Sequence, residues 1–305
     1  MKTLNDGSQA APYLRKDLTL TTLLHLPATS AFSDVKIEDL GSACKRLKAL
    51  GYVGVQHPDS TPALAAGLMA TGSSAIVEPE KAEAIVGSFK QRGFEAMSVT
   101  VGNGLERADE AARLLQAVLD AAAVHDFPVY VETHRATITQ DIRRTLDLVE
   151  RFPEIRFNAD LSHWYTGHEM NRANFDTYVE ALAPVFERVR FVQGRIGNSG
   201  SIQIDIRAED RFDCIEHHRK LWTLCFEGFL ANAGPGDFLP FNPEVLPPAI
   251  VWRGMRLPIC YGREFRQADG SFVEEGDRWG QAQLYWEMAQ QCFALAQKNA
   301  AKTGE

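Results

Sequence analysis

The stretch from Pro128 to Asp160 reads PVYVETHRATITQDIRRTLDLVERFPEIRFNAD. It begins and ends with short apolar runs, 128–134 and 155–160, that have the composition of strands. Between them, 138–153 carries apolar residues at helical spacing and ends at a proline. A strand, a helix and a second strand in this order are typical of a parallel sheet.

The same alternation runs through most of the chain. We expect strands at 18–26, 52–59, 68–77, 95–104, 128–134, 155–160, 189–196 and 257–265. We expect helices at 36–51, 61–67, 79–93, 106–127, 138–153, 174–187 and 277–299. Such a series of strand–helix units favours the α/β class, and a closed (β/α)8 TIM barrel rather than an open sheet.

Two segments do not follow this rhythm. Residues 1–18 are expected to be a flexible lead-in. Residues 196–255 include a stretch rich in glycine and proline, and we expect a long insertion after strand seven that forms a lid at the C-terminal face of the barrel. The sequence thus predicts one TIM-barrel domain over residues 1–305.

Composition narrows the classes of function. The chain has a net charge of −8 and a pI near 5.6, which argues against a nucleic-acid partner held through its phosphates. Its five cysteines are scattered and contain no CxxC pair, so neither a disulfide framework nor a zinc ribbon is expected. Neither a secretory signal nor a membrane span is recognisable. We therefore expect a cytoplasmic enzyme that acts on a small molecule.

Four polar residues stand at the ends of the last four expected strands. They are Glu132, Asp160, Gln193 and Glu264. Because the active sites of such barrels lie at the C-terminal strand ends, these residues are expected to converge. Their oxygen atoms suit a hard divalent cation, with Mn²⁺ or Mg²⁺ favoured and Co²⁺ or Zn²⁺ as alternatives.

A metal at this place suits chemistry beside a carbonyl group. The metal would polarise the C=O and stabilise an enediolate, while Glu132 and Glu264 remove and return the adjacent proton. The alternative for each carboxylate taken singly is an exposed salt bridge at a strand end. Four such residues at successive strand ends favour the site.

Five further residues are candidates for contact with the substrate. His163 could contact substrate, bind the metal or be structural, and Arg195 could bind a substrate oxygen, orient Glu264 or form a structural salt bridge. His134 shares the face of Glu132, and His57 ends the second strand. Trp164 could form an apolar wall against a sugar ring or simply pack in the core.

These positions resemble the pattern of the xylose-isomerase-like barrel superfamily, the sugar phosphate isomerase/epimerase group. That pattern has Glu on strand five, Asp-x-x-His on strand six, His or Gln on strand seven and Glu on strand eight. Here it would fall on Glu132, on Asp160 with His163, on Gln193 and on Glu264. Ketose 3-epimerases of the group have histidine at the position of Gln193, whereas bacterial dehydroshikimate dehydratases have glutamine.

The resemblance implies a divalent-metal-dependent isomerase or epimerase of a sugar or polyol. The alternative is a metal-dependent lyase or dehydratase on a keto-sugar or 3-keto-glycoside. Less favoured are a metal-free sugar-binding relic and an apurinic endonuclease, whose histidine-rich zinc cluster is not matched here. We expect no partner beyond a carbohydrate substrate, with a homodimer or homotetramer left open.

Overall fold

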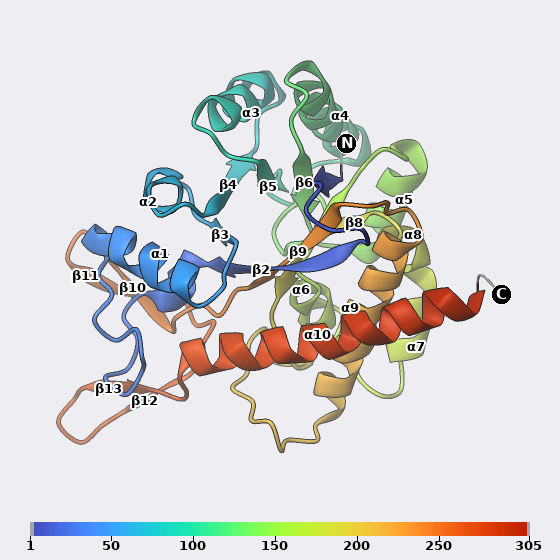
Figure 1. Cartoon of the computed structure of the whole chain (residues 1–305). Coiled ribbons are helices and arrows are strands. Elements are labelled where there is room, and N and C mark those ends of the chain that lie inside the picture. The colour runs from blue at the N-terminus through green and yellow to red at the C-terminus, as the bar shows by residue number, and fades with distance from the viewer. Residues whose placement is uncertain (1–2, 304–305) are drawn as a thin grey trace.

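The computed structural model describes residues 3–303 and forms a closed barrel of parallel strands surrounded by helices (Figure 1). The ring consists of eight strands: β2 (Tyr13–Thr19), β3 (Gly54–Gln56), β4 (Met69–Ile76), β5 (Ala96–Val101), β6 (Val129–Glu132), β7 (Phe157–Ala159), β8 (Val189–Gly194) and β9 (Asp237–Pro243). Strand β9 closes the ring because it pairs with β8 on one side and with β2 on the other. A short strand, β1 (Leu4–Asn5), adds to β9 in antiparallel orientation outside the ring. The expected α/β barrel is confirmed.

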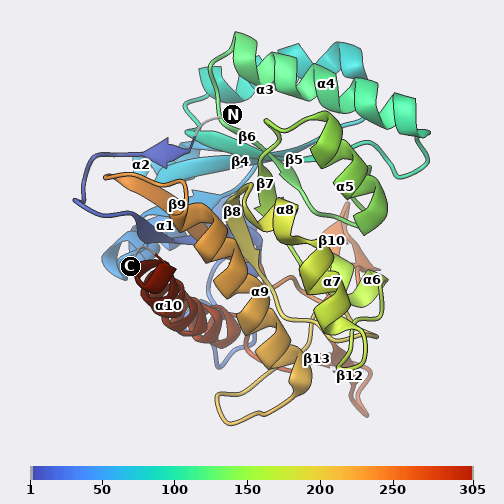
Figure 2. The same cartoon turned by 90° about the vertical axis from the view of Figure 1, so that its right-hand side faces the viewer.

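Helices cover the outside of the ring (Figures 1 and 2). They are α1 (Leu40–Ala49), α2 (Thr61–Ala65), α3 (Ala82–Gln91), α4 (Ala108–Val124), α5 (Ile142–Arg151), α6 (Ser162–Gly167), α7 (Phe175–Ala181), α8 (Ala183–Phe186), α9 (Asp213–Leu230) and α10 (Arg278–Thr303). Their apolar faces bury the main hydrophobic core. Within the described residues, none of the helices has the length and apolarity that a membrane crossing requires.

The first barrel strand begins earlier than the sequence predicted. Strand β2 starts at Tyr13, so the expected flexible lead-in of residues 1–18 is wrong, although Met1 and Lys2 lie outside the described residues. The sequence of β2 was not recognised as a strand because it contains charged residues. Arg15 is buried and donates hydrogen bonds to Asp17 at 2.6 Å and to Glu95 at 2.9 Å, so the charges are paired inside the fold.

The eighth strand also differs from the prediction. It is β9, within the stretch that was expected to be a lid, whereas 257–265 lies in two hairpins outside the ring. Strand β9 was not predicted because it contains two prolines, which are tolerated at their positions in the strand. Pro240 precedes the residues that pair with β8, and Pro243 is the last residue of the strand.

The irregular segment therefore follows strand eight. We call residues 247–274 the arm. It contains two antiparallel hairpins, β10 (Ala249–Trp252) with β11 (Met255–Pro258) and β12 (Glu264–Arg266) with β13 (Phe272–Glu274). The arm projects from one side of the barrel, beside α1 in Figure 1. The interval 196–255, expected to be an insertion, contains the eighth strand in addition to helix α9.

One glycine makes a close approach between helices that can be tested. A Cβ atom at Gly228 of α9 would lie 2.2 Å from the carbonyl oxygen of Phe186. We expect Gly228→Ala to lower the free energy of unfolding by about 1–3 kcal/mol, because backbone must move to relieve the overlap. Gly167→Ala is the matched control, since nothing lies within 4 Å of its added Cβ and alanine favours the helix. Urea denaturation measures both, and equal effects of the two replacements would contradict this reading of the packing.

Candidate active site

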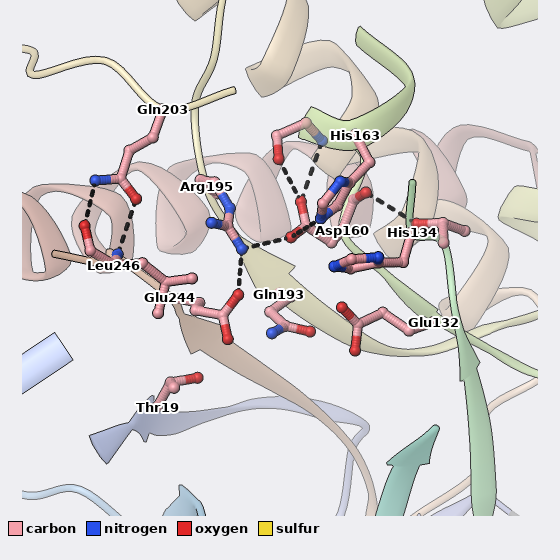
Figure 3. Close-up of polar contacts among 12 residues, drawn as sticks. Thr19, Glu132, His134, Asp160, His163, Gln193, Arg195, Gln203, Glu244 and Leu246 are labelled. Atoms are coloured by element: carbon pink, nitrogen blue, oxygen red, sulfur yellow. Dashed lines mark hydrogen bonds and ion pairs between the residues drawn. The ribbon is translucent and has the colours of Figure 1, made fainter. Parts of the chain in front are cut away.

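Four strand ends bring polar side chains together at one end of the barrel. Glu132 is the last residue of β6, Asp160 follows β7, Gln193 is the next-to-last residue of β8, and Glu244 follows β9. All of these side chains are buried or nearly so. Figure 3 shows Gln193 between Glu132 and Glu244, with Arg195 bridging Asp160 and Glu244.

The structure does not bring Glu264 into this cluster. Glu264 is the first residue of β12 in the arm, where its carboxylate pairs with Arg256. Its assignment to the eighth barrel strand was wrong, and Glu244 occupies the place expected for it. A signal for Glu244 did exist, because the short apolar run 238–241 ends in Asn-Pro-Glu.

Arg195 is the cation of the cluster. It is only 1% exposed, and its Nη2 donates to Asp160 Oδ2 at 2.8 Å and to Glu244. Burial would by itself raise the pKa of Asp160, but the charge of Arg195 and the contacts of His163 and Ser162 hold that pKa well below its usual range. Asp160 is therefore ionised, and Arg195 orients it together with Glu244.

The pKa of Glu132 responds to burial and to the negative charge that Arg195 leaves unbalanced. Its Oε2 accepts a hydrogen bond from Ser98 at 3.0 Å. Burial, and then the charges of Glu244 and Asp160, raise the pKa of Glu132 to about 8. Burial also raises the pKa of Glu244, against the opposing charge of Arg195. Three carboxylates face one guanidinium, so the site has a deficit of positive charge.

Two histidines lie beside Glu132. The rings of His134 and His163 are 3.9 Å apart between centroids, and one ligand atom from each of Glu132, His134 and His163 lies within 4.8 Å of the others. Burial lowers the pKa of both histidines, that of His134 to about 4, so both imidazoles are neutral. His163 Nε2 is 3.4 Å from Asp160 Oδ2, and its Nδ1 has no hydrogen-bond partner among the described residues. A ring in this state is free to bind a metal or a substrate oxygen.

Gln193 belongs to a buried polar network across the inside of the barrel. Its Oε1 accepts a hydrogen bond from Asn158, whose Nδ2 also donates to Ser98 at 2.8 Å. On the other side, Gln193 Nε2 is 3.5 Å from Gln56 Oε1, which Thr19 also contacts at 3.0 Å. The network holds the side chains of the site in place before any ligand binds. No motif in the sequence pointed to it.

A cavity of about 250 Å³ opens directly above these groups. It is lined by Thr19, Thr21, Gln56, His57, Pro58, Ser73, Ser74, Thr100, Glu132, His134, Gln193, Glu244, Leu246 and Tyr261. We call it the barrel cavity. His57 and His134 lie on its wall.

The aromatic wall of the barrel cavity is not the expected one. Trp164 is 1% exposed and its indole donates to the Thr139 carbonyl at 2.7 Å, so it packs in the core and does not line the cavity. Tyr261, from the arm, lies there instead, with its ring 4.7 Å from the guanidinium of Arg195. Sequence reasoning missed Tyr261 because the arm was interpreted as a strand.

Structural comparison finds known proteins with a similar fold. A xylose isomerase-like TIM barrel protein from Mycobacterium smegmatis, solved in complex with magnesium, superposes with a TM-score of 0.54 over 95% of this chain and 99% of its own, at 12% identity. The chain has the xylose isomerase-like barrel fold. No protein-family model and no curated protein matches the sequence.

Two other solved structures superpose with lower TM-scores. A probable 3-DHS dehydratase involved in petrobactin synthesis in Bacillus anthracis gives a TM-score of 0.48 at 12% identity, over 75% of this chain and 92% of its own. Endonuclease IV from Thermus thermophilus gives 0.43 at 17% identity, over 78% and 93%. At these identities the likeness concerns the fold alone, so the chemistry has to be argued from the side chains.

Proposed function

We propose that this protein is a divalent-metal-dependent enzyme that moves a proton next to the carbonyl group of a sugar or polyol, as an isomerase or epimerase. The observation that carries the proposal is the convergence of Glu132, Asp160, Gln193 and Glu244 beside one buried arginine. Such a set has no evident structural purpose, because burying carboxylates without enough counter-charge is costly.

The residues fit a divalent cation. The charge of the cation would oppose the effects of burial and of the neighbouring carboxylates, which raise the pKa of Glu132. Among the described residues, the buried Nδ1 of His163 has no hydrogen-bond partner. Glu132, Asp160, Gln193 and Glu244 would hold the metal, with His163 within reach. When bound, a metal of this kind polarises the substrate carbonyl. Oxygen ligands favour Mn²⁺ or Mg²⁺, and the nearby imidazoles keep Co²⁺ and Zn²⁺ as alternatives.

Two glutamates are placed to handle the proton. Glu132 and Glu244 come from strands on either side of Gln193 (Figure 3), so they would flank a substrate lying over Gln193. One takes the proton from the carbon beside the carbonyl, and the other returns a proton for epimerisation. Burial raises the pKa of each in the metal-free site, and a bound cation would oppose that shift, so their roles as base and acid are argued from their positions.

A lyase or dehydratase on a keto-sugar or 3-keto-glycoside is the second candidate. The close pair of neutral imidazoles, His134 and His163, favours it. Beside Glu132 they can donate a hydrogen bond to an oxygen that leaves from the next carbon, and the proton that Glu132 has taken can pass to that oxygen. Both reactions begin with the same proton abstraction.

Metal binding is the first test. After dialysis against EDTA, Mn²⁺ at one hundred times its Kd is expected to stabilise the protein by about 2.7 kcal/mol, seen as a rise in Tm of roughly 5 °C. Elemental analysis of the reconstituted protein should find one equivalent. If the protein binds no divalent metal even after reconstitution, the metal-free relic is the better interpretation.

Exchange in D₂O then separates the two reactions. A panel of keto-sugars and keto-glycosides is incubated with the Mn²⁺-loaded protein and followed by NMR. An isomerase or epimerase incorporates deuterium into recovered sugar, whereas a lyase releases an unsaturated product. If no sugar of the panel incorporates deuterium and none yields an unsaturated product, the result contradicts proton transfer on a carbohydrate.

A further inference from the structure

A second cavity of about 670 Å³ lies between the arm and the segment 25–28. Its lining is largely apolar and comprises His25, Leu26, Pro27, Ala28, Pro247, Pro248, Ala249, Ile250, Val251, Arg256, Glu264, Phe272, Val273 and Glu274. We call it the arm cavity. It falls within the range of roughly 300–1,000 Å³ that is usual for small-molecule sites.

Residues that line the arm cavity and residues that line the barrel cavity are neighbours in sequence along three separate segments of chain. Leu246 lines the barrel cavity, and the next residue, Pro247, lines the arm cavity. In the same way, Thr21 of the barrel cavity is followed within a few residues by His25, and Tyr261 by Glu264. A ligand in the barrel cavity that carries a substituent could therefore extend into the arm cavity.

The two cavities differ in chemistry. The walls of the barrel cavity are hydroxyl, amide, imidazole and carboxylate groups, and neither lysine nor arginine is among its lining residues. In the arm cavity, by contrast, Val251, Phe272 and Val273 are 53%, 47% and 51% exposed. Apolar side chains gathered in this way around a cavity mark a place where apolar surface is buried by a ligand. The pair suits a molecule with a neutral polyol at one end and an apolar group at the other.

The walls of the arm cavity are anchored. The buried Arg278 donates to the carbonyl of Leu24 at 2.5 Å and to Glu274 at 2.7 Å, and so ties the segment before the cavity to the second hairpin. At the boundary between the cavities, Gln203 makes both a donor and an acceptor contact with the backbone of Leu246, at 2.9 and 2.8 Å. The cavity is therefore preformed, which lowers the entropic cost of filling it.

We propose that the arm cavity binds the apolar group, or aglycone, of a glycoside whose sugar ring occupies the barrel cavity. This inference rests on the proposed function only in using the barrel cavity as the sugar site. It assigns the substrate class as a neutral sugar bearing a ring-sized apolar substituent, and it gives the arm a role in specificity.

Ligand binding tests the inference without turnover. Phenyl β-D-glucoside and methyl β-D-glucoside differ only in the group that would reach the arm cavity. Their dissociation constants are measured by titration NMR on the full chain with saturating Mn²⁺. We expect the phenyl glucoside to bind at least tenfold more tightly, and a difference below twofold would overturn the inference.

Variants locate the effect. Val273→Asp places a charge in the arm cavity and is expected to remove the preference for the phenyl glucoside while leaving the affinity for the methyl glucoside unchanged. Val124→Asp is the matched control, because Val124 is an exposed valine at the end of α4, is 67% exposed and lines neither cavity. If both variants keep the preference, the phenyl group binds elsewhere and the inference is wrong. Should Val273→Asp not fold, the comparison of the two glucosides on the unmodified chain still decides.

Two further readouts separate this inference from its competitors. Sedimentation of the unmodified chain and of Val273→Asp tests whether a second copy of the chain covers the arm; a dimer that the replacement dissociates would overturn the inference.

Glu132→Gln should keep the preference for the phenyl glucoside even where it abolishes proton exchange. If the unmodified chain prefers the phenyl glucoside but exchanges no proton, only the proposed catalysis is contradicted. If it exchanges the proton but shows no preference, only this inference is contradicted.

Discussion

Replacing either Glu132 or Glu244 by glutamine is expected to lower kcat for proton exchange by about 10³-fold, within the range for loss of a general acid or base. Glutamine keeps the shape of the side chain but cannot accept the proton. It also removes one negative charge from the cluster, so the affinity for Mn²⁺ should fall in both variants. Single-turnover exchange in D₂O and Mn²⁺ titration measure the two effects separately.

Two other glutamates serve as comparisons for these variants. Glu180→Gln changes an exposed carboxylate on α7 and should leave both kcat and Mn²⁺ affinity unchanged. Glu264→Gln should leave Mn²⁺ affinity unchanged, because the carboxylate pairs with Arg256 in the arm. Loss of Mn²⁺ binding in Glu264→Gln with retention in Glu244→Gln would contradict the site described above.

Replacing Arg195 by methionine is expected to destabilise the metal-free protein by about 3–5 kcal/mol, the usual cost of removing one partner from a buried ion pair. Asp160 and Glu244 would then lose their shared counter-charge, as would the cluster that includes Glu132. Mn²⁺ should restore much of the loss, since it supplies the missing positive charge. Urea denaturation in EDTA and in Mn²⁺ measures the difference.

The control for Arg195→Met is an exposed arginine. Arg172 pairs with Asp213 at 2.8 Å, but both side chains are largely exposed, so Arg172→Met should cost less than about 1 kcal/mol and should not respond to Mn²⁺. Arg195→Lys keeps the charge but cannot reproduce the two-carboxylate geometry, and it should fall between the two. If Arg195→Met is destabilised equally with and without Mn²⁺, the metal does not bind next to this arginine.

Three of the four strand ends could be recognised in the sequence because their strands are short apolar runs bounded by helices. Glu132, Asp160 and Gln193 each end such a run. The period of alternation then suffices to bring them to one end of the barrel. Their metal-binding role remains a proposal, although their convergence is a property of the fold.

Glu244 and Arg15 were missed for related reasons. The strand before Glu244 contains prolines, and the strand that holds Arg15 contains charges, so local composition argued against both strands. Each is stabilised by partners far away in the chain: β9 by β2 and β8, and Arg15 by Glu95. Local propensity is overruled wherever tertiary pairing supplies the missing interactions.

The sequence by itself determined the α/β class, the barrel and the place of the candidate site, because periodicity and strand ends are local features that the chain order preserves. Only the tertiary structure decided which glutamate completes the cluster, that Arg195 bridges two of its carboxylates, and that the arm adds Tyr261 and a second cavity. These features depend on which distant segments meet when the ring closes at β2 and β9. Contacts of that kind arise when the sheet closes, and no periodic pattern in the sequence predicts them.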